Sequence, residues 1–330
     1  MMRAVVVAET GEAEVLQVKD VPEPQPEAGQ VTINVAFAAV GLVDVLVRRG
    51  TFNTPLPFVP GFEVAGYIRA LGKGVNHLRV GQPVAAMLYE RMGGYAEVAT
   101  ASAGLTIALD DLDKPLDLAT ATAFLGNVTT AYLVLTTVVA LRPGQSVLVH
   151  GSTGGLGSAL GQVARQLGAS WVLGTVSGRN KEEYAKSLGY NTVVLANSFV
   201  TEVREATRGR GVDLVLDPVG GVLRAQSLEV LSPLGCLVLL GNASGEADVP
   251  QSSNTLWLGN KGVIGFNLGG LSREAPNQVA DAAQKALSMV ARGELRTDTT
   301  DVLPLEQVVE AHHRLEQRKT PGKLILRLSD

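Results

Sequence analysis

The chain has 330 residues, of which 46% are hydrophobic and 18% charged, and its formal net charge at pH 7 is −4. A chain of this length and composition can bury a large core and is expected to form two packed domains. The small net charge, without a run of like charges, argues against a nucleic-acid or anionic-membrane partner.

The cellular setting is inferred from three features of the sequence. A single cysteine, Cys236, excludes an intrachain disulfide, and its apolar, strand-like surroundings predict a buried thiol. The N-terminal apolar run ends at Glu9 and is too short for a signal peptide. The apolar stretch 131–141 is interrupted by threonines and is not expected to span a bilayer. These features predict a cytoplasmic protein.

The first hundred residues are expected to be rich in β-strands. Short runs with many β-branched residues occupy 4–8, 31–39 and 64–71, with turn residues between them. The proline-rich segment 22–26 is a connector, because proline supplies no hydrogen-bond donor to a sheet.

From about Leu116 the pattern becomes helical and then alternates between strands and helices. Helices are expected at 118–128 and 130–139, followed by strands at 146–150, 171–176, 193–195, 212–216 and 235–241 with helices at 156–167, 181–188, 199–207 and 223–231 between them. Such alternation predicts a parallel sheet covered on both faces. One more strand is expected after Gly262, then helices at 276–292 and 305–317 and a closing strand at 323–328.

The most informative motif is the glycine-rich turn Gly151-Ser-Thr-Gly-Gly-Leu-Gly157. It follows an apolar strand and leads directly into a helix. Glycines at such a turn let the backbone approach a pyrophosphate, and the N–H groups at the helix start bind the anion. The G-x-x-G-x-x-G spacing alone is weak evidence, but the strand, the helix and the following βαβ series favour a dinucleotide site over a purely structural turn.

The end of the second strand of this series discriminates between the two nicotinamide cofactors. An NAD enzyme usually carries Asp or Glu here to bind the ribose 2′-hydroxyl. The segment instead offers Ser177, Arg179 and Lys181, and its first carboxylate is Glu182. Donors and positive charge favour a 2′-phosphate and therefore NADPH, although the same residues are also compatible with a solvated turn.

Several motifs together resemble the medium-chain dehydrogenase/reductase superfamily. Besides the glycine turn, they are Pro60-Gly-Phe-Glu-Val-Ala-Gly66, Gly93-Gly-Tyr-Ala-Glu97, Thr130-Ala-Tyr132, Asp217-Pro-Val-Gly-Gly221 and Gly322-Lys-Leu-Ile-Leu326. In combination they are similar to the quinone oxidoreductase, or zeta-crystallin, group. The resemblance implies an α/β protein with a GroES-like, β-rich catalytic domain at 1–125 and 270–330. A Rossmann domain with a doubly wound parallel sheet would occupy 126–269 and bind NADPH. It also implies a homodimer formed through a sheet edge near 263–266.

The chain departs from the zinc-dependent members of that superfamily. Gly41 stands where they carry a cysteine ligand, and Phe62 stands where they carry a histidine ligand. A zinc site needs three or four N, S or O ligands, so we expect no catalytic zinc. We expect the four histidines (His77, His150, His312 and His313) to be structural or exposed.

Other departures concern the cofactor and substrate sites. Quinone reductases commonly have asparagine at the position of Gly41 and tyrosine at the position of Leu46, and Ala196 replaces a tyrosine that packs near the adenosine phosphate. The family's basic positions near that phosphate remain as Lys181 and Arg318. The resemblance therefore implies a largely intact cofactor site beside a more apolar substrate site.

The resemblance assigns most of the candidate cofactor contacts. They are Asn127, Thr130, Gly151, Thr153, Gly154, Gly155, Leu156, Gly157, Ser177, Arg179, Lys181, Gly241, Asn242, Ala243, Phe266, Asn267, Leu268 and Arg318. The candidates on the substrate side are fewer. Asp44 is either catalytic or a helix cap, and Phe52, Tyr89 and Tyr95 either line a substrate pocket or pack in the core. No general acid can be named.

The expected function is NADPH-dependent reduction of quinones or α,β-unsaturated carbonyl compounds, without zinc. An enoyl-thioester reductase of the polyketide or fatty-acid type is the alternative enzyme. A crystallin-like protein that binds NADPH without turnover is the non-enzymatic alternative, and the loss of polar residues at Gly41 and Leu46 is its main support.

Overall fold

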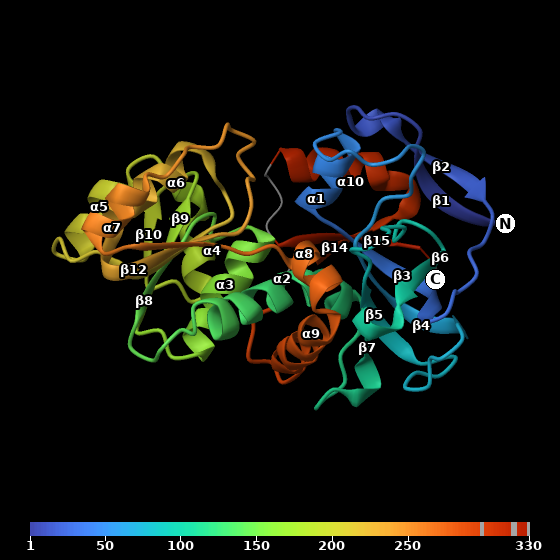
Figure 1. The fold of residues 1–330 in the computed structure, drawn as a ribbon. Helices are drawn as coiled ribbons and strands as arrows, with labels where there is room; N and C mark the ends of the chain where they lie inside the picture. The colour runs from blue at the N-terminus through green and yellow to red at the C-terminus, as the bar shows by residue number, and fades with distance from the viewer. Residues whose placement is uncertain (298–299, 318–321, 329–330) are drawn as a thin grey trace. The chain divides into compact units, whose positions relative to one another are not determined.

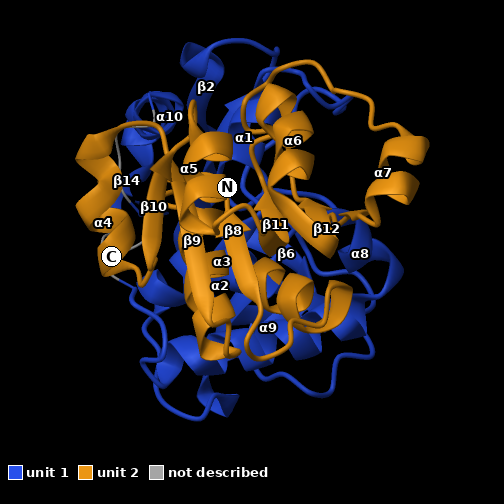
Figure 2. Ribbon diagram, turned by 90° about the vertical axis from the view of Figure 1, so that its left-hand side faces the viewer, with its two compact units in different colours: residues 1–129, 268–330 blue, residues 130–267 orange. Residues whose placement is uncertain are grey.

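The computed structural model describes residues 1–297, 300–317 and 322–328. The chain divides into two compact units, and each is described here by itself (Figure 2). Unit 1 comprises Met1–Thr129 and Leu268–Asp330, and unit 2 comprises Thr130–Asn267. These limits lie within a few residues of the boundaries expected from the sequence.

Unit 1 is built on two antiparallel-rich sheets. β1 (Met2–Val7) pairs with β2 (Leu16–Val21), and the larger sheet has the order β14-β15-β3-β4-β5-β7, with β6 also pairing with β3. The strands of the larger sheet are β3 (Gln30–Val40), β4 (Glu63–Leu71), β5 (Pro83–Met87), β6 (Val98–Ser102), β7 (Thr106–Ala108), β14 (Thr300–Pro304) and β15 (Lys323–Arg327). Alternating apolar residues of β3 and β4, such as Val31, Ile33 and Ile68, fill the core of this unit.

Helices of unit 1 come from both ends of the chain, as Figure 1 shows by colour. They are α1 (Leu42–Arg48), α8 (Leu268–Glu274), α9 (Pro276–Ala291) and α10 (Val308–Glu316), together with most of α2 (Leu118–Leu133). Pro276 stands at the first position of α9, where its missing N–H costs nothing. The C-terminal strand β15 pairs antiparallel with β3, so the two sequence segments of unit 1 share one sheet.

Unit 2 contains a six-stranded sheet, in which all five neighbouring pairs are parallel. Its order is β10-β9-β8-β11-β12-β13, and Figure 2 shows β10, β9, β8, β11 and β12 side by side in that order. The strands are β8 (Ser146–Val149), β9 (Trp171–Val176), β10 (Thr192–Leu195), β11 (Val212–Asp217), β12 (Leu231–Leu239) and β13 (Gly262–Gly265). The helices are α3 (Gly155–Gln166), α4 (Glu182–Ser187), α5 (Phe199–Ala206), α6 (Gly221–Ser227) and α7 (Ser253–Gly259).

This strand order places a topological switch point at the centre of the sheet. From β8 the chain proceeds outward through β9 to β10, and it then returns to β11 and proceeds the other way through β12 to β13. β8 and β11 are parallel neighbours, with Leu216 opposite Val149. In open α/β sheets of this kind, ligands bind outside the carboxyl ends of the strands that flank the switch point. The loops after β8 and β11 are therefore where a ligand site is expected.

The structure corrects three details of the sequence prediction. The two helices expected at 118–128 and 130–139 are one helix, α2, which continues as a π-helical segment at Val134–Val138. The helix expected at 223–231 is α6, which ends at Ser227 and is followed by a 3-10 turn. β12 then begins at Leu231, four residues earlier than expected, because Leu231 pairs with Val212 before a register shift in the strand.

The helix of residues 118–138 is long and apolar enough to cross a membrane by length and composition alone. The expectation from the sequence concerned only residues 131–141, and the apolar helix begins before that stretch. However, 72% of the most apolar window is buried inside the protein. This burial is typical of a helix in a protein core.

Candidate dinucleotide and catalytic sites

The glycine-rich loop after β8 is fastened to the neighbouring strand β9 by Thr175. The N–H of Gly151 donates to Oγ1 of Thr175 over 3.1 Å. Both the N–H and the hydroxyl of Ser152 donate to the Thr175 carbonyl, over 3.0 and 2.9 Å. Gly151 has φ of +64°, a backbone conformation that glycine adopts without strain. The loop is thus fixed at the switch point before any ligand binds.

The close approach of this loop to helix α3 depends on Gly157. A Cβ added at Gly157 would lie 2.1 Å from the carbonyl oxygen of Gly151, whereas one added at Gly154 would lie 3.4 Å from the same atom. The buried hydroxyl of Tyr190 donates to the Gly157 carbonyl over 2.6 Å and holds the helix start from the other side. An α-helix leaves its first N–H groups without acceptors inside the helix. Those of α3 therefore fit an anion such as a pyrophosphate.

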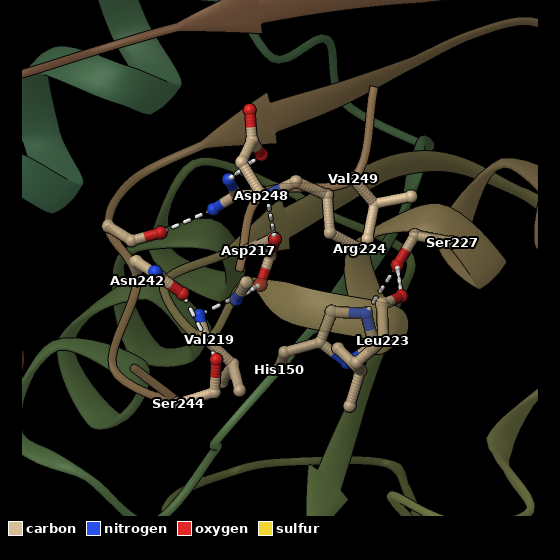
Figure 3. Close-up of polar contacts among 12 residues, drawn as sticks. His150, Asp217, Val219, Leu223, Arg224, Ser227, Asn242, Ser244, Asp248 and Val249 are labelled. Atoms are coloured by element: carbon tan, nitrogen blue, oxygen red, sulfur yellow. Dashed lines mark hydrogen bonds and ion pairs between the residues drawn. The ribbon is translucent and has the colours of Figure 1, made fainter. Parts of the chain in front are cut away.

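Asp217, at the end of β11, holds the loop that follows this strand (Figure 3). This carboxylate is fully buried. Its Oδ1 accepts from the N–H groups of Val219 and Gly220 over 2.8 and 2.9 Å. Its Oδ2 accepts from Nε of Arg224 over 2.7 Å. The Asp217–Gly221 motif found in the sequence is thus a turn closed on its own aspartate.

The third loop at this edge follows β12 and contains the predicted contacts Gly241, Asn242 and Ala243. Arg224 donates to the Gly241 carbonyl from Nη2. The side chain of Asn242 bonds within its own loop. It donates to the Glu246 carbonyl over 2.8 Å. It accepts from the Ser244 hydroxyl over 3.0 Å (Figure 3). In the structure as it stands, the Asn242 side chain therefore shapes the loop.

His150 lies under these loops and is fully buried. Nε2 lies 2.8 Å from the Ser227 hydroxyl and Nδ1 lies 3.3 Å from the Thr175 hydroxyl. Burial lowers the pKa of His150 to about 4, so the ring is neutral at physiological pH. Its hydrogen bonds and its edge-on contact with Phe199 indicate a structural role, as expected from the sequence.

The residues predicted to select NADPH lie at the end of β9. Ser177 and Arg179 are exposed and Lys181 is half-buried. The Arg179 guanidinium lies 3.5 Å from Glu182 and 3.4 Å from Glu202. Glu202 was missed by the sequence analysis because it lies 23 residues beyond Arg179 on α5. Its other carboxylate oxygen accepts from the Ser198 hydroxyl, so Glu202 also contacts the residue that precedes α5.

The candidate contacts Asn127 and Thr130 lie on α2, close to a buried ion pair within unit 1. Glu63 accepts from the N–H of Gly126 over 3.1 Å and pairs with Lys323 over 3.4 Å. A Cβ added at Gly126 would lie 2.8 Å from the Glu63 carboxyl group. Glycine is therefore required for the carboxylate to reach the helix. Neither Glu63 nor Lys323 was singled out in the sequence, because only the tertiary fold brings β4, β15 and α2 together.

The remaining cofactor candidates differ in how far their side chains are exposed to solvent. Phe266 is half-buried, Asn267 is exposed and Leu268 is buried at the start of α8. Arg318 lies outside the described residues.

Asp44 is buried and caps the start of α1. Its two oxygens accept from the N–H groups of Gly41 and Gly61 over 2.8 and 3.0 Å. Burial is the main cause that raises the pKa of Asp44 to about 7. The nearby Glu63 carboxylate raises it further, whereas the two hydrogen bonds and Lys323 lower it. The geometry supports the capping role, since both oxygens are engaged by the backbone.

The aromatic candidates for the substrate pocket lie in different environments. Phe52 is half-exposed, at 50%. Tyr89 is partly buried, with its ring 5.6 Å from that of Phe62. Tyr95 has no exposed surface and its hydroxyl lies 3.4 Å from Nε2 of His312. Core packing, the alternative left open for Tyr95, is the role that its burial favours.

Comparison with known proteins is consistent with this arrangement. The GroES-like domain model of alcohol dehydrogenases matches residues 27–111, and the zinc-binding dehydrogenase model matches residues 155–286. The quinone oxidoreductase of Lama guanicoe is 31% identical over 99% of this chain and 98% of its own. The chain belongs to the quinone oxidoreductase group of the medium-chain dehydrogenase/reductase superfamily. The human synaptic vesicle membrane protein VAT-1 homolog is 30% identical, over 94% of this chain and 82% of that protein.

Solved structures of this group have the same fold. The Escherichia coli quinone oxidoreductase, solved as a complex with NADPH, superimposes with a TM-score of 0.90. It is 27% identical, and the match covers 98% of this chain and 99% of that one. The predicted family, and its fold of a GroES-like unit with a parallel-sheet nucleotide-binding unit, are therefore confirmed.

The family model that matches residues 155–286 is named for zinc binding, whereas the positions where the resemblance implies zinc ligands, Gly41 and Phe62, lie outside that match. Gly41 and Phe62 offer no metal-binding atom in their side chains. Across the part of the chain that the structure describes, no group of three or more His, Cys, Asp or Glu side chains is placed to hold a metal ion. The half-buried Cys236 lies in β12, where burial raises its thiol pKa.

Proposed function

We propose that this member of the quinone oxidoreductase group is an NADPH-dependent, zinc-independent reductase of quinones or α,β-unsaturated carbonyl compounds. The observation that carries the proposal is the glycine loop at the switch point of unit 2, which packs so closely on α3 that a Cβ added at Gly157 would lie 2.1 Å from the Gly151 carbonyl oxygen. The NADPH complex of the E. coli relative supports the choice of cofactor.

The residues of unit 2 fit a dinucleotide. The backbone of Gly151–Gly157 and the start of α3 would hold the pyrophosphate, because they offer N–H groups without large side chains. The loops after β11 and β12 lie at the same edge of the sheet and would border the dinucleotide. Asn127 and Thr130, one helical turn apart on α2, would contact the nicotinamide end, and Phe266, Asn267 and Leu268 would pass beside it.

The choice of NADPH over NADH rests on the charge at the end of β9. Ser177, Arg179 and Lys181 supply a hydroxyl donor and two cations for a 2′-phosphate. Glu182 and Glu202 already pair with Arg179. A bound phosphate would compete with these carboxylates for the guanidinium. We therefore expect a preference for NADPH that is moderate and weakened by salt.

The chemistry suits an acceptor that is already electron-poor. When bound, NADPH supplies a hydride to the β-carbon of an enone or to a quinone, and a proton from water completes the reduction. The protein's own part is to orient the two reactants and to exclude water from the reacting atoms. With glycine at position 41 and leucine at 46, the substrate side offers few hydrogen-bond donors. This composition favours acceptors that stabilise the developing charge themselves.

We further propose that the protein is a homodimer formed through β13. This strand lies at an edge of the six-stranded sheet, and exposed edges readily pair with another strand. Ile264 on β13 is 38% exposed, and Trp257 and Leu258 on the preceding helix α7 are 75% and 72% exposed. Exposed apolar side chains of this size favour a protein partner. Ile264→Lys should yield monomers in light scattering, whereas the control Val80→Lys, at an exposed valine of unit 1, should leave the dimer intact.

A cytoplasmic protein with a small-molecule substrate is part of the same proposal. The net charge of −4 supports the absence of a nucleic-acid or anionic-membrane partner.

The proposal is tested by following NADPH oxidation with a panel of acceptors, with NADH in parallel. The panel contains 1,4-benzoquinone, 9,10-phenanthrenequinone, 2-alkenals and crotonyl thioesters. Faster turnover of quinones or alkenals than of thioesters, and faster turnover with NADPH than with NADH, supports the proposal. The best rate with thioesters would favour an enoyl-thioester reductase instead. NADPH binding without turnover of any acceptor would favour the crystallin-like alternative, and a preference for NADH would refute the phosphate site.

A further inference from the structure

The ion pair between Asp217 and Arg224 has no assigned role in the reaction, although it lies at the switch point. Both side chains are largely buried, with 0% and 10% of their surfaces exposed. Asp217 ends β11, the strand beside β8, so the pair sits next to the glycine-rich loop. A buried ion pair adds little net stability, because desolvation of its two charges offsets their attraction. Its contacts with the loops after β11 and β12 suggest a positional role.

The aspartate side of the pair positions the loop that touches the glycine turn. Through Val219 and Gly220, Asp217 holds the backbone of the β11 loop in place. A Cβ added at Gly151 would lie 3.5 Å from Cγ2 of Val219, so the two loops lie close together. The conformation of residues 217–221 therefore limits the space above the glycine loop.

The arginine side of the pair positions the loop after β12. While Nε bonds to Asp217, Nη2 donates to the Gly241 carbonyl and Nη1 lies 3.6 Å from the carboxylate of Asp248 (Figure 3). Further along, the N–H groups of Ala243 and Ser244 donate to the carbonyls of Pro218 and Val219. One guanidinium thus joins the β11 strand end to both ends of residues 241–248.

We propose that Arg224 is a positioning residue for the cofactor site, holding residues 241–248 in the conformation that borders the dinucleotide. This inference rests on the proposed function, since it takes NADPH as the ligand of that edge. The planar guanidinium is required because it presents several donors in a fixed geometry. The single ammonium of a lysine can neutralise Asp217, but it cannot also reproduce the spread of contacts to Gly241 and Asp248.

Three variants separate positioning from structural support. Arg224→Met leaves a buried, unpaired carboxylate and should lower the melting temperature and weaken NADPH binding. Arg224→Lys should restore most of the melting temperature while NADPH affinity stays about tenfold weaker than in the wild type, the size expected for one lost hydrogen bond to a charged group. Arg204→Lys, at an exposed arginine of α5 that donates to the Glu229 carbonyl outside residues 217–221 and 241–248, should change neither quantity much.

Two measurements are needed, one of them independent of the cofactor. NADPH affinity is followed by the fluorescence of the bound nicotinamide. Amide hydrogen exchange without NADPH should be faster at Ala243 and Ser244 in Arg224→Lys than in the wild type. The proposal is overturned if Arg224→Lys matches the wild type in affinity and exchange, or if affinity falls only in parallel with stability. A wild-type protein that exchanges slowly here but binds no NADPH would refute the proposed function and the assigned ligand, and not the loop contacts.

Discussion

Substitution of Gly157 by alanine gives the most direct test of the loop geometry. The new methyl carbon would lie 2.1 Å from the Gly151 carbonyl oxygen, 2.8 Å from the Gly151 carbonyl carbon and 3.0 Å from Cα of Ser152. To reach an ordinary contact, the start of α3 must move away from the loop by about 1 Å. Overpacking of this kind typically costs about 1–3 kcal/mol in the free energy of unfolding. For a domain of this size, 1 kcal/mol lowers the melting temperature by roughly 2–4 °C.

Gly154→Ala is the matched control, because its methyl carbon would lie 3.4 Å from the same oxygen and its φ is −78°. Thermal unfolding by circular dichroism should show Gly157→Ala melting several degrees below Gly154→Ala. A fluorescence titration should also show weaker NADPH binding by Gly157→Ala than by the wild type, because the N–H groups of α3 are displaced. Equal melting temperatures for the two variants would refute the argument from close approach.

Three further predictions concern other parts of the molecule. Gly126→Ala should lower the unfolding free energy by about 1–3 kcal/mol, because its methyl group meets the Glu63 carboxyl, whereas Gly104→Ala, with 3.8 Å to its nearest neighbour, should not. Glu202→Gln should strengthen NADPH binding about two- to fivefold at low salt by removing one of the two carboxylates that pair with Arg179, more than Glu183→Gln on the neighbouring helix does. Denaturant unfolding should show a pH dependence set by His150, His312 and Asp44. The folded-state pKa values of the two histidines are lowered by burial to about 4 and 3, so their stabilisation is lost as the pH falls below about 6.5. The pKa of Asp44 is raised to about 7, so its protonation offsets one of them between about pH 7 and 4. From these three groups the free energy of unfolding of the wild type should fall by about 1.4 kcal/mol for each unit that the pH drops between 6.5 and 4, and that of Asp44→Asn by about twice as much. Equal pH slopes for the two proteins would contradict the raised pKa of Asp44.

The sequence predicted the fold because its local signals agree with the tertiary structure. Apolar runs separated by turn residues specify the strands of unit 2, and the glycine turn after Val149 specifies the start of α3. The errors occurred where a local pattern is ambiguous. The threonines within residues 118–138 do not interrupt the helix. Thr122 and Thr129 donate their hydroxyls to carbonyls of the preceding turn, a contact that the sequence pattern does not show.

The candidate site was predictable only in part. The glycine loop is contiguous in the sequence, so its spacing could be recognised directly. The contacts that shape its surroundings are not contiguous. Arg224 reaches Gly241 across 17 residues, Glu202 reaches Arg179 across 23, and Lys323 reaches Glu63 across 260. Each depends on strand order, which the sequence pattern does not specify.

The sequence alone determined the family, the two-unit organisation and the position of the glycine loop, because these follow from periodicity, glycine spacing and motifs. The tertiary structure decided which charges face one another. It brought Glu63 to Gly126, put Glu202 beside Arg179 and placed Arg224 between two loops. It also buried Tyr95 and set both Asp44 oxygens against backbone N–H groups, because burial and hydrogen-bond partners are properties of the packed chain and not of the residue's neighbours in sequence.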